Sequence, residues 1–167
     1  MALAAPSAYD VGEVLTLNDT AKIATERIKN RFTYTGALML ALDAEYPRIQ
    51  TKEDSLPKKR INRVFWRWAR DFSRYAKNKL FEEAVADFES AKANGFPFRP
   101  YEATMRYQPT LNRDCTLSVT TDQYEYAGGA HGSTVRYSAS FDLRTGRRIR
   151  LRDLFARGDA WRRIVLE

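Results

Sequence analysis

The 167-residue sequence has one cysteine, Cys115, and one histidine, His131. A single cysteine excludes an intrachain disulfide, and the alternation of Cys115 with Leu117 and Val119 predicts a buried core thiol. One histidine and one cysteine argue against a zinc site with the usual ligands, so we expect neither a metal nor another cofactor. The alternative is a nucleophilic pairing of Cys115 with His131, which requires the two side chains to meet in space.

Long hydrophobic runs are also absent. No stretch approaches the ~18 uncharged apolar residues of a transmembrane helix, and residues 1–6 lack the basic start and apolar core of a signal peptide. Hydrophobic residues make up 44% and charged residues 29% of the chain, which excludes a mainly disordered protein. Lysine and arginine outnumber aspartate and glutamate by 28 to 21, and the net charge of +7 favours anionic partners or serves solubility.

The first half of the chain predicts two strands followed by a helix. Residues 22–32 favour a strand, and residues 37–46 predict a central, buried strand whose ladder ends at Pro47. A polar connection then leads to Ser55, which is placed to cap a helix that has Pro57 in its first turn.

The predicted helix is long and amphipathic. Its apolar residues recur every three or four positions and form one stripe, made by Ile61, Phe65, Trp68, Phe72, Tyr75 and Ala76. The helix is expected to bend or break near Asn78 and to end at Asn94 and Gly95, which favour a left-handed stop. Trp66 lies off the stripe, so it is either a contact residue or is packed under a loop.

After the helix the apolar period changes to two, which predicts consecutive antiparallel strands. The alternating residues are Tyr101, Ala103, Met105 and Tyr107, then Cys115, Leu117 and Val119, then Val135, Tyr137, Ala139 and Phe141. A turn over residues 142–146 leads into a short return strand over residues 147–151. Asp159 is placed to cap a short helix. The predicted fold class is α+β, with an antiparallel β-sheet packed against one long helix and a short C-terminal helix.

A glycine-rich loop is the first candidate ligand site. Residues 124–132 read Tyr-Glu-Tyr-Ala-Gly-Gly-Ala-His-Gly. Three glycines so close together require unusual backbone angles or close approach of another group, and their N–H groups could form an anion-binding concavity. The candidate ligand-binding residues are Tyr124, Tyr126, Gly128, Gly129 and His131. The alternative is a wide hairpin loop whose histidine caps a backbone carbonyl.

Arginines near the end of the chain form the second candidate site. Arg147, Arg148 and Arg150 lie close together, with Arg144 and Arg152 on either side. Further basic residues decorate the long helix. Such a surface binds an anionic polymer such as teichoic acid, or anionic lipid headgroups, or it is a solvated face paired with acidic residues.

Carboxylate pairs are the other candidates for catalysis. Glu82 and Glu83 are adjacent in the predicted helix and do not share a face. Asp43 and Glu45 share a strand face, but nothing else supports a general acid–base role for them. We therefore expect no enzymatic activity and assign no catalytic residue.

Two motifs carry a family resemblance. The glycine–histidine loop, followed by Phe141-Asp142-Leu143-x-Thr145-Gly146-x-x-Ile149-x-Leu151-x-Asp153-Leu154-Phe155, resembles the extracytoplasmic module of RsiV-type anti-sigma factors and of some PdaC-like peptidoglycan deacetylases. Upstream, Tyr46-Pro47-x-Ile49 and Ile61-Asn62 resemble the companion module found ahead of it. The resemblance implies a strand–helix module over residues 13–110 and the start of a second, truncated module over residues 111–167, packed as one globular unit.

The resemblance implies a function outside the cytoplasm. In the characterised anti-sigma factors this module binds lysozyme, and in the deacetylases the chemistry belongs to a separate domain. The expectation is a non-catalytic binding or sensing domain of a bacterial envelope protein, secreted or membrane-anchored, whose ligand is a lysozyme-like protein or a cell-wall glycan. Nucleic acid is not expected. The alternatives are a basic domain for an anionic polymer or membrane surface, and an accessory domain of a peptidoglycan deacetylase.

Overall fold

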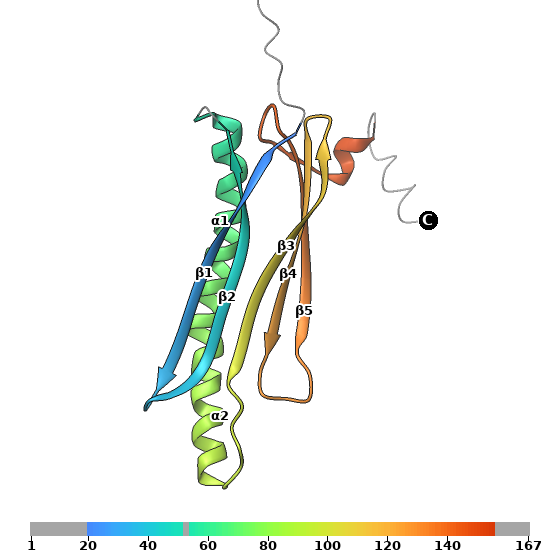
Figure 1. The fold of residues 1–167 in the computed structure, drawn as a ribbon. Coiled ribbons are helices and arrows are strands. Elements are labelled where there is room, and N and C mark those ends of the chain that lie inside the picture. The colour runs from blue at the N-terminus through green and yellow to red at the C-terminus, as the bar shows by residue number, and fades with distance from the viewer. Residues whose placement is uncertain (1–19, 52–53, 156–167) are drawn as a thin grey trace, which may run out of the picture.

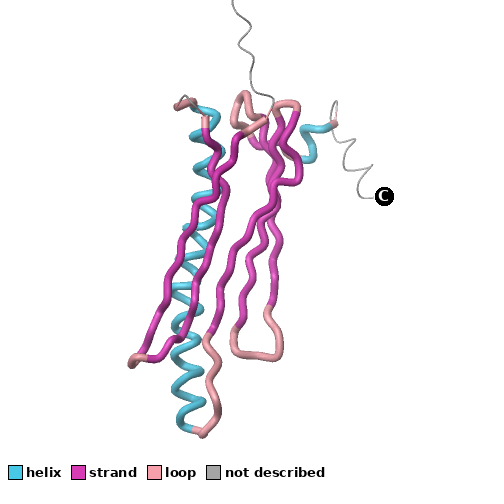
Figure 2. The backbone as a smooth tube through the Cα atoms, viewed as in Figure 1, coloured by secondary structure: helices cyan, strands magenta, loops and turns pink. Residues whose placement is uncertain are grey.

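The computed structural model describes residues 20–51 and 54–155. Its elements are β1 (Lys22–Tyr34), β2 (Ala37–Gln50), α1 (Leu56–Tyr75), the π-helical turn η1 (Ala76–Leu80), α2 (Phe81–Ala93), β3 (Tyr101–Arg113), β4 (Thr116–Tyr126), β5 (Ser133–Asp142), β6 (Arg148–Ile149) and the 3-10 turn η2 (Leu151–Leu154). The strands form one sheet in chain order, and the long helix runs beside it (Figures 1 and 2).

The sheet is mixed, so the prediction of a purely antiparallel sheet is wrong at one place. β2 pairs with β3 in parallel, with residues Leu40 to Ala44 opposite Tyr101 to Met105, while the other neighbouring strands are antiparallel. Parallel neighbours need a long crossover. The continuous helix from α1 to α2 supplies it by returning the chain to the end of the sheet where β2 began (Figure 1).

Pro47 does not end its strand, contrary to the prediction. β2 continues to Gln50, and Pro47 lies opposite Thr25 of β1. The pairing of β2 with β3 stops at Ala44. At Pro47 the strand therefore has β1 as its one ladder partner, and a missing N–H is tolerated on such an edge.

The helix begins and ends where the sequence predicts. Ser55 occupies the N-cap position and Pro57 lies in the first turn, although the Ser55 side chain makes no capping hydrogen bond. Past the end of α2, Gly95 has a φ of 70°, the left-handed conformation that stops a helix. The expected irregularity near Asn78 is confirmed as the π-helical turn.

The π-helical turn keeps the apolar stripe on the sheet. Phe72, Ala76, Leu80 and Ala84 are buried and four residues apart, a spacing that drifts around a regular 3.6-residue helix. The wider turn, with its i→i+5 hydrogen bonds, offsets this drift. As a result, α2 continues to cover β2 and β3 with the same face.

The core has two adjoining clusters. One joins α1, η1 and α2 to β2 and β3, and the other joins the first half of α1 to β4 and β5. In the second cluster the rings of Phe65 and Phe141 meet at 5.4 Å between centroids. Cys115 is buried, as predicted. The predicted core face of β5 is only half correct, because Val135 and Tyr137 are 51% and 44% exposed.

The end of the described chain is less regular than predicted. The return strand is limited to Arg148–Ile149, and a 3-10 turn follows it. The predicted helix after Asp159 lies outside the described residues. Within the described ranges, the structure has no helix long and apolar enough to cross a membrane.

Candidate functional site: an arginine pocket at the end of the sheet

The structure separates the two predicted sets of ligand-binding residues. The glycine-rich loop over residues 127–132 joins β4 to β5 at one end of this hairpin, whereas Arg147, Arg148 and Arg150 follow β5 at its other end (Figure 1). Because β5 is ten residues long, the two sets lie roughly 30 Å apart at about 3.3 Å per residue. They are therefore two candidate sites rather than one.

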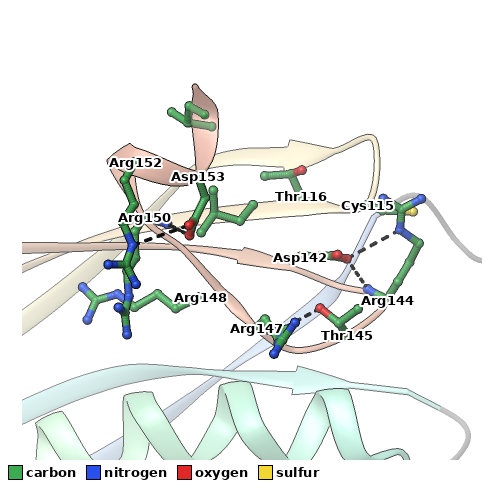
Figure 3. Close-up of a pocket in the computed structure, with 12 residues that line it drawn as sticks. Cys115, Thr116, Asp142, Arg144, Thr145, Arg147, Arg148, Arg150, Arg152 and Asp153 are labelled. Atoms are coloured by element: carbon green, nitrogen blue, oxygen red, sulfur yellow. Dashed lines mark hydrogen bonds and ion pairs between the residues drawn. The ribbon is translucent and has the colours of Figure 1, made fainter. Parts of the chain in front are cut away.

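The arginines surround a pocket of about 800 Å³, the arginine pocket, which is shown in Figure 3. The turn after β5, β6, η2 and the start of β4 form its walls. Five arginines line it: Arg144, Arg147, Arg148, Arg150 and Arg152. Two aspartates, Asp142 and Asp153, lie among them. The pocket is therefore strongly positive.

The turn that carries these arginines is fixed by Asp142 and Gly146. The carboxylate of Asp142 accepts a hydrogen bond from the backbone N–H of Arg144 at 2.8 Å, and Gly146 N–H donates to the Asp142 carbonyl at 2.8 Å. Burial raises the pKa of Asp142, but these turn hydrogen bonds and the charge of Arg144 outweigh it and lower the pKa overall. Gly146 has a φ of 67°, and a Cβ there would lie 2.6 Å from the backbone of Pro57. The turn is thereby seated against the start of α1.

The two aspartates leave much of the positive charge uncompensated. Asp142 pairs with Arg144 at 3.5 Å and Asp153 with Arg152 at 3.8 Å. Asp153 also accepts the backbone N–H of Arg150 at 2.8 Å. Among the described residues, the guanidinium groups of Arg147 and Arg150 have no ion-pair partner. The pocket therefore offers two unpaired guanidinium forks, which suit phosphate or carboxylate oxygens.

The glycine-rich loop has a packing reason for its glycines. A Cβ on Gly132 would lie 2.4 Å from the ring of Tyr124, so this ring needs the glycine for its close approach. Gly128 has a φ of 74°. His131 is exposed, and its Nδ1 lies 3.3 Å from the carbonyl of Gly132. These features match the alternative interpretation, a wide hairpin loop whose histidine contacts a backbone carbonyl.

A smaller hollow of about 390 Å³ adjoins this loop. Gly128 and Gly129 line it together with Asp87, Phe98 and Tyr101. Tyr101 donates a hydrogen bond to Asp87 at 2.5 Å, and burial, followed by this aspartate, raises the pKa of Tyr101. Arg99 also lines the hollow and offsets the negative charge of Asp87, so this hollow lacks the excess positive charge of the arginine pocket.

The remaining catalytic alternatives are not supported by the geometry. Cys115 and His131 lie at opposite ends of the 11-residue strand β4, roughly 35 Å apart at about 3.3 Å per residue. Asp43 binds Arg27 and Arg106, whose hydrogen bonds lower the pKa of Asp43 to about 2 despite partial burial. Glu45 lies 3.7 Å from Arg27. In the described part of the chain, no group of three or more His, Cys, Asp or Glu is placed to hold a metal ion.

Sequence reasoning missed a third hollow, of about 370 Å³, between α1 and the β4–β5 hairpin. We call it the aromatic groove; it is lined by Trp68, Asp71, Phe72, Tyr75, Gln123, Glu125 and Tyr137. The alternation along β5 predicts that Tyr137 is in the core, but it is 44% exposed. The sequence does carry one signal of this hollow on β4. Gln123 and Glu125 lie on the same face of the strand as Val119 but are polar, which indicates that this end of the face is not buried. Trp66 lies elsewhere on α1 and is 45% exposed. The guanidinium carbon of Arg70 lies over its ring, 4.8 Å from the ring centroid.

The fold and the hollows define a small α+β module in which a crossover helix covers a mixed sheet and leaves pockets at its margins. By its sequence the chain belongs to the family described as Deacetylase PdaC, whose model matches residues 36–134. This confirms the PdaC-like resemblance. No curated protein matches the sequence.

Solved structures that share the fold include two DUF3298-family proteins. A DUF3298-family protein from Bacteroides fragilis superposes with a TM-score of 0.66 at 17% identity, over 86% of this chain and 64% of that one. A DUF3298-family protein from Pseudomonas aeruginosa superposes with a TM-score of 0.53 at 15% identity, over 87% of this chain and 64% of that one. The chain thus spans about two thirds of their length. Family and fold together indicate an accessory domain. The division at residues 110 and 111 stays a prediction, as does the RsiV-like part of the resemblance.

Proposed function

We propose that the chain is a non-catalytic, extracytoplasmic binding module of a bacterial envelope protein, and that its arginine pocket binds an anionic cell-wall polymer. The observation that supports this ligand class is the arginine pocket itself, in which two guanidinium groups have no carboxylate partner among the residues that the structure describes. Membership of the PdaC family supports the accessory role and the envelope setting.

Phosphodiester groups fit this pocket by charge and by hydrogen-bonding pattern. A guanidinium group donates two parallel hydrogen bonds to a phosphate, and such charge-assisted bonds are about twice as strong as neutral ones. The net charge of +7 adds long-range attraction for a polyanion. A teichoic-acid chain presents such groups repeatedly, so several could be engaged at once.

Isothermal titration against purified wall teichoic acid, at several salt concentrations, tests the proposal. We expect the double variant Arg147→Gln/Arg150→Gln to bind at least about tenfold more weakly, because charged hydrogen bonds contribute about 1.5–3 kcal/mol each. The matched control is Arg63→Gln/Arg67→Gln, which removes the same charge from the exposed face of α1. Equal losses in both double variants would mean non-specific attraction. Affinity that does not fall with rising salt would refute the ionic mechanism.

The other ligand that the family resemblance implies, a lysozyme-like protein, enters the same experiment as a competing arm. One outcome is that lysozyme binds tightly and equally well to the parent and to Arg147→Gln/Arg150→Gln, while the polymer does not bind. This outcome would show that the ligand is a protein and not the polymer. The extracytoplasmic location has its own test: an epitope-tagged protein in intact cells must be accessible to added protease.

A further inference from the structure

We infer that the aromatic groove is a second binding site, for a neutral pyranose ring of a glycan chain. The groove opens where α1 no longer covers β5. Phe141, near the end of β5, is buried under Phe65, whereas Tyr137 is 44% exposed beside the groove. An exposed tyrosine ring in a hollow, rather than on a convex surface, is placed to contact a ligand.

Two inclined aromatic rings form the apolar wall. Trp68 of α1 and Tyr137 of β5 lie 6.1 Å apart between ring centroids, at an angle of 44°. The indole packs edge-on against Phe65 at 5.9 Å, which fixes its orientation from behind. The C–H groups of a sugar ring present a flat apolar face that stacks on aromatic rings, whose π faces carry a partial negative charge.

Three other residues that line the groove supply hydrogen-bond groups. The hydroxyl of Tyr75 donates to a carboxylate oxygen of Glu125 at 3.1 Å, so this carboxylate is held at the groove. Among the described residues Glu125 has no ion-pair partner, whereas Asp71 is paired with both Arg70 and Arg74. Burial, followed by the charge of Glu125, raises the pKa of Tyr75, so its phenol stays protonated. Gln123 adds an amide whose nitrogen donates to the sulfur of Met105 at 3.8 Å and whose oxygen is an acceptor.

These features select the ligand class. A carboxylate next to two aromatic rings disfavours an anion and accepts hydrogen bonds from hydroxyl groups. A volume of about 370 Å³ lies at the lower end of the range for small-molecule pockets, ~300–1,000 Å³. Aromatic rings for C–H faces, combined with carboxylate and amide groups for hydroxyls, match an uncharged sugar.

Arg148 connects the groove to the arginine pocket. Its guanidinium lies 5.8 Å from the Trp68 ring centroid and donates to the carbonyl of Ser138 at 2.8 Å, and it lines the arginine pocket as well. A polymer of sugars and phosphates would thus reach both sites along one path. The idea that one polymer occupies both sites rests on the proposed function, but the proposed sugar site does not depend on it.

The test uses neutral probes, an N-acetylglucosamine tetramer and a glucose tetramer, which carry no charge for the arginine pocket. In ¹⁵N-labelled protein the indole signal of Trp68 is expected to shift with at least one probe, while that of Trp66 does not. Tyr137→Ala should weaken binding at least tenfold. Tyr137→Phe should retain most of it, because the ring stays. Trp66→Ala is the matched control and should bind like the parent.

Each contrary outcome is informative. If neither probe shifts the Trp68 signal at millimolar concentration, the sugar site is wrong. It is equally wrong if Tyr137→Ala, folded by circular dichroism, binds like the parent. A concentration-dependent dimer abolished by Tyr137→Ala, without sugar binding, would assign the groove to a second copy of the chain. Arg147→Gln/Arg150→Gln should leave tetramer binding unchanged, so failure of the polymer proposal is distinguishable from failure of this one.

Discussion

The carboxylate of Asp43 holds three strands together, and removing its charge is predicted to destabilise the sheet. Asp43 lies on β2 and binds Arg27 of β1 through both oxygens, at 2.6 and 2.5 Å. It also binds Arg106 of β3 at 2.9 Å, and Arg106 donates to the Asp43 carbonyl at 2.7 Å. The residue therefore stands at the parallel junction between β2 and β3, which has a short ladder. Asp43→Asn keeps the size of the side chain and removes the charge.

The magnitude follows from the pKa. The arginines lower the pKa of Asp43 from 3.8 to about 2, and at about 1.36 kcal/mol per unit this is a stabilisation of about 2 kcal/mol at neutral pH. Both arginines are close to half exposed, 47% and 45%. Solvent screening thus reduces the expected loss to about 1–2 kcal/mol. Because the folded pKa is the lower one, the contribution is complete above about pH 5 and is lost as the pH falls towards 2.

Urea unfolding of parent and variant, measured between pH 7 and pH 3, provides the assay. The difference in unfolding free energy should be largest at pH 7 and should shrink steadily with acid. The control is Asp122→Asn, which breaks a similar two-point pair with Arg136 between β4 and β5, at 2.7 Å. That pair is solvent-exposed, so its loss should cost clearly less. An Asp43→Asn variant as stable as the parent at pH 7, or a difference independent of pH, would refute the reasoning.

Two further substitutions test the packing around the sites. The hydroxyl of Thr121 is buried without a hydrogen-bond partner among the described residues. Thr121→Val should therefore raise the free energy of unfolding by about 1 kcal/mol, and a lower urea midpoint would contradict this. Gly146→Ala should lower it by more than about 1 kcal/mol, because its φ of 67° and the backbone of Pro57 leave no room for a Cβ. Gly129→Ala, which meets nothing within 4 Å, is the control and should change it by less than about 0.5 kcal/mol.

Local signals in the sequence predicted the elements well. The N-cap at Ser55, the stop at Gly95, the turn that ends at Gly146 and the irregularity at Asn78 all lie where expected. Each depends on backbone preferences that act within a few residues. The parallel pairing of β2 with β3 was missed because strand direction is decided by where the long helix returns the chain. Alternation along a strand is the same in both directions.

Burial along β5 shows why the aromatic groove could not be predicted from the sequence. Val135, Tyr137, Ala139 and Phe141 alternate identically, yet only Ala139 and Phe141 are buried. Alternation identifies a face of the sheet, but the length and path of the covering helix decide how much of that face is covered. The arginine pocket was accessible to prediction because its residues are close together in the chain. The groove joins residues of α1 to residues of two strands that follow roughly fifty to seventy positions later in the chain.

The two proposed sites have a common structural origin in how far α1 covers the sheet. The first half of α1 buries Ala139 and Phe141, and Pro57 seats the turn at Gly146 that carries the arginines. Towards its C-terminal end, α1 passes from β4 and β5 to β2 and β3, where the π-helical turn keeps it in register. This path leaves Tyr137 uncovered beside Trp68. The same helix thus stabilises the arginine turn and opens the groove, so both proposed sites depend on the intact crossover.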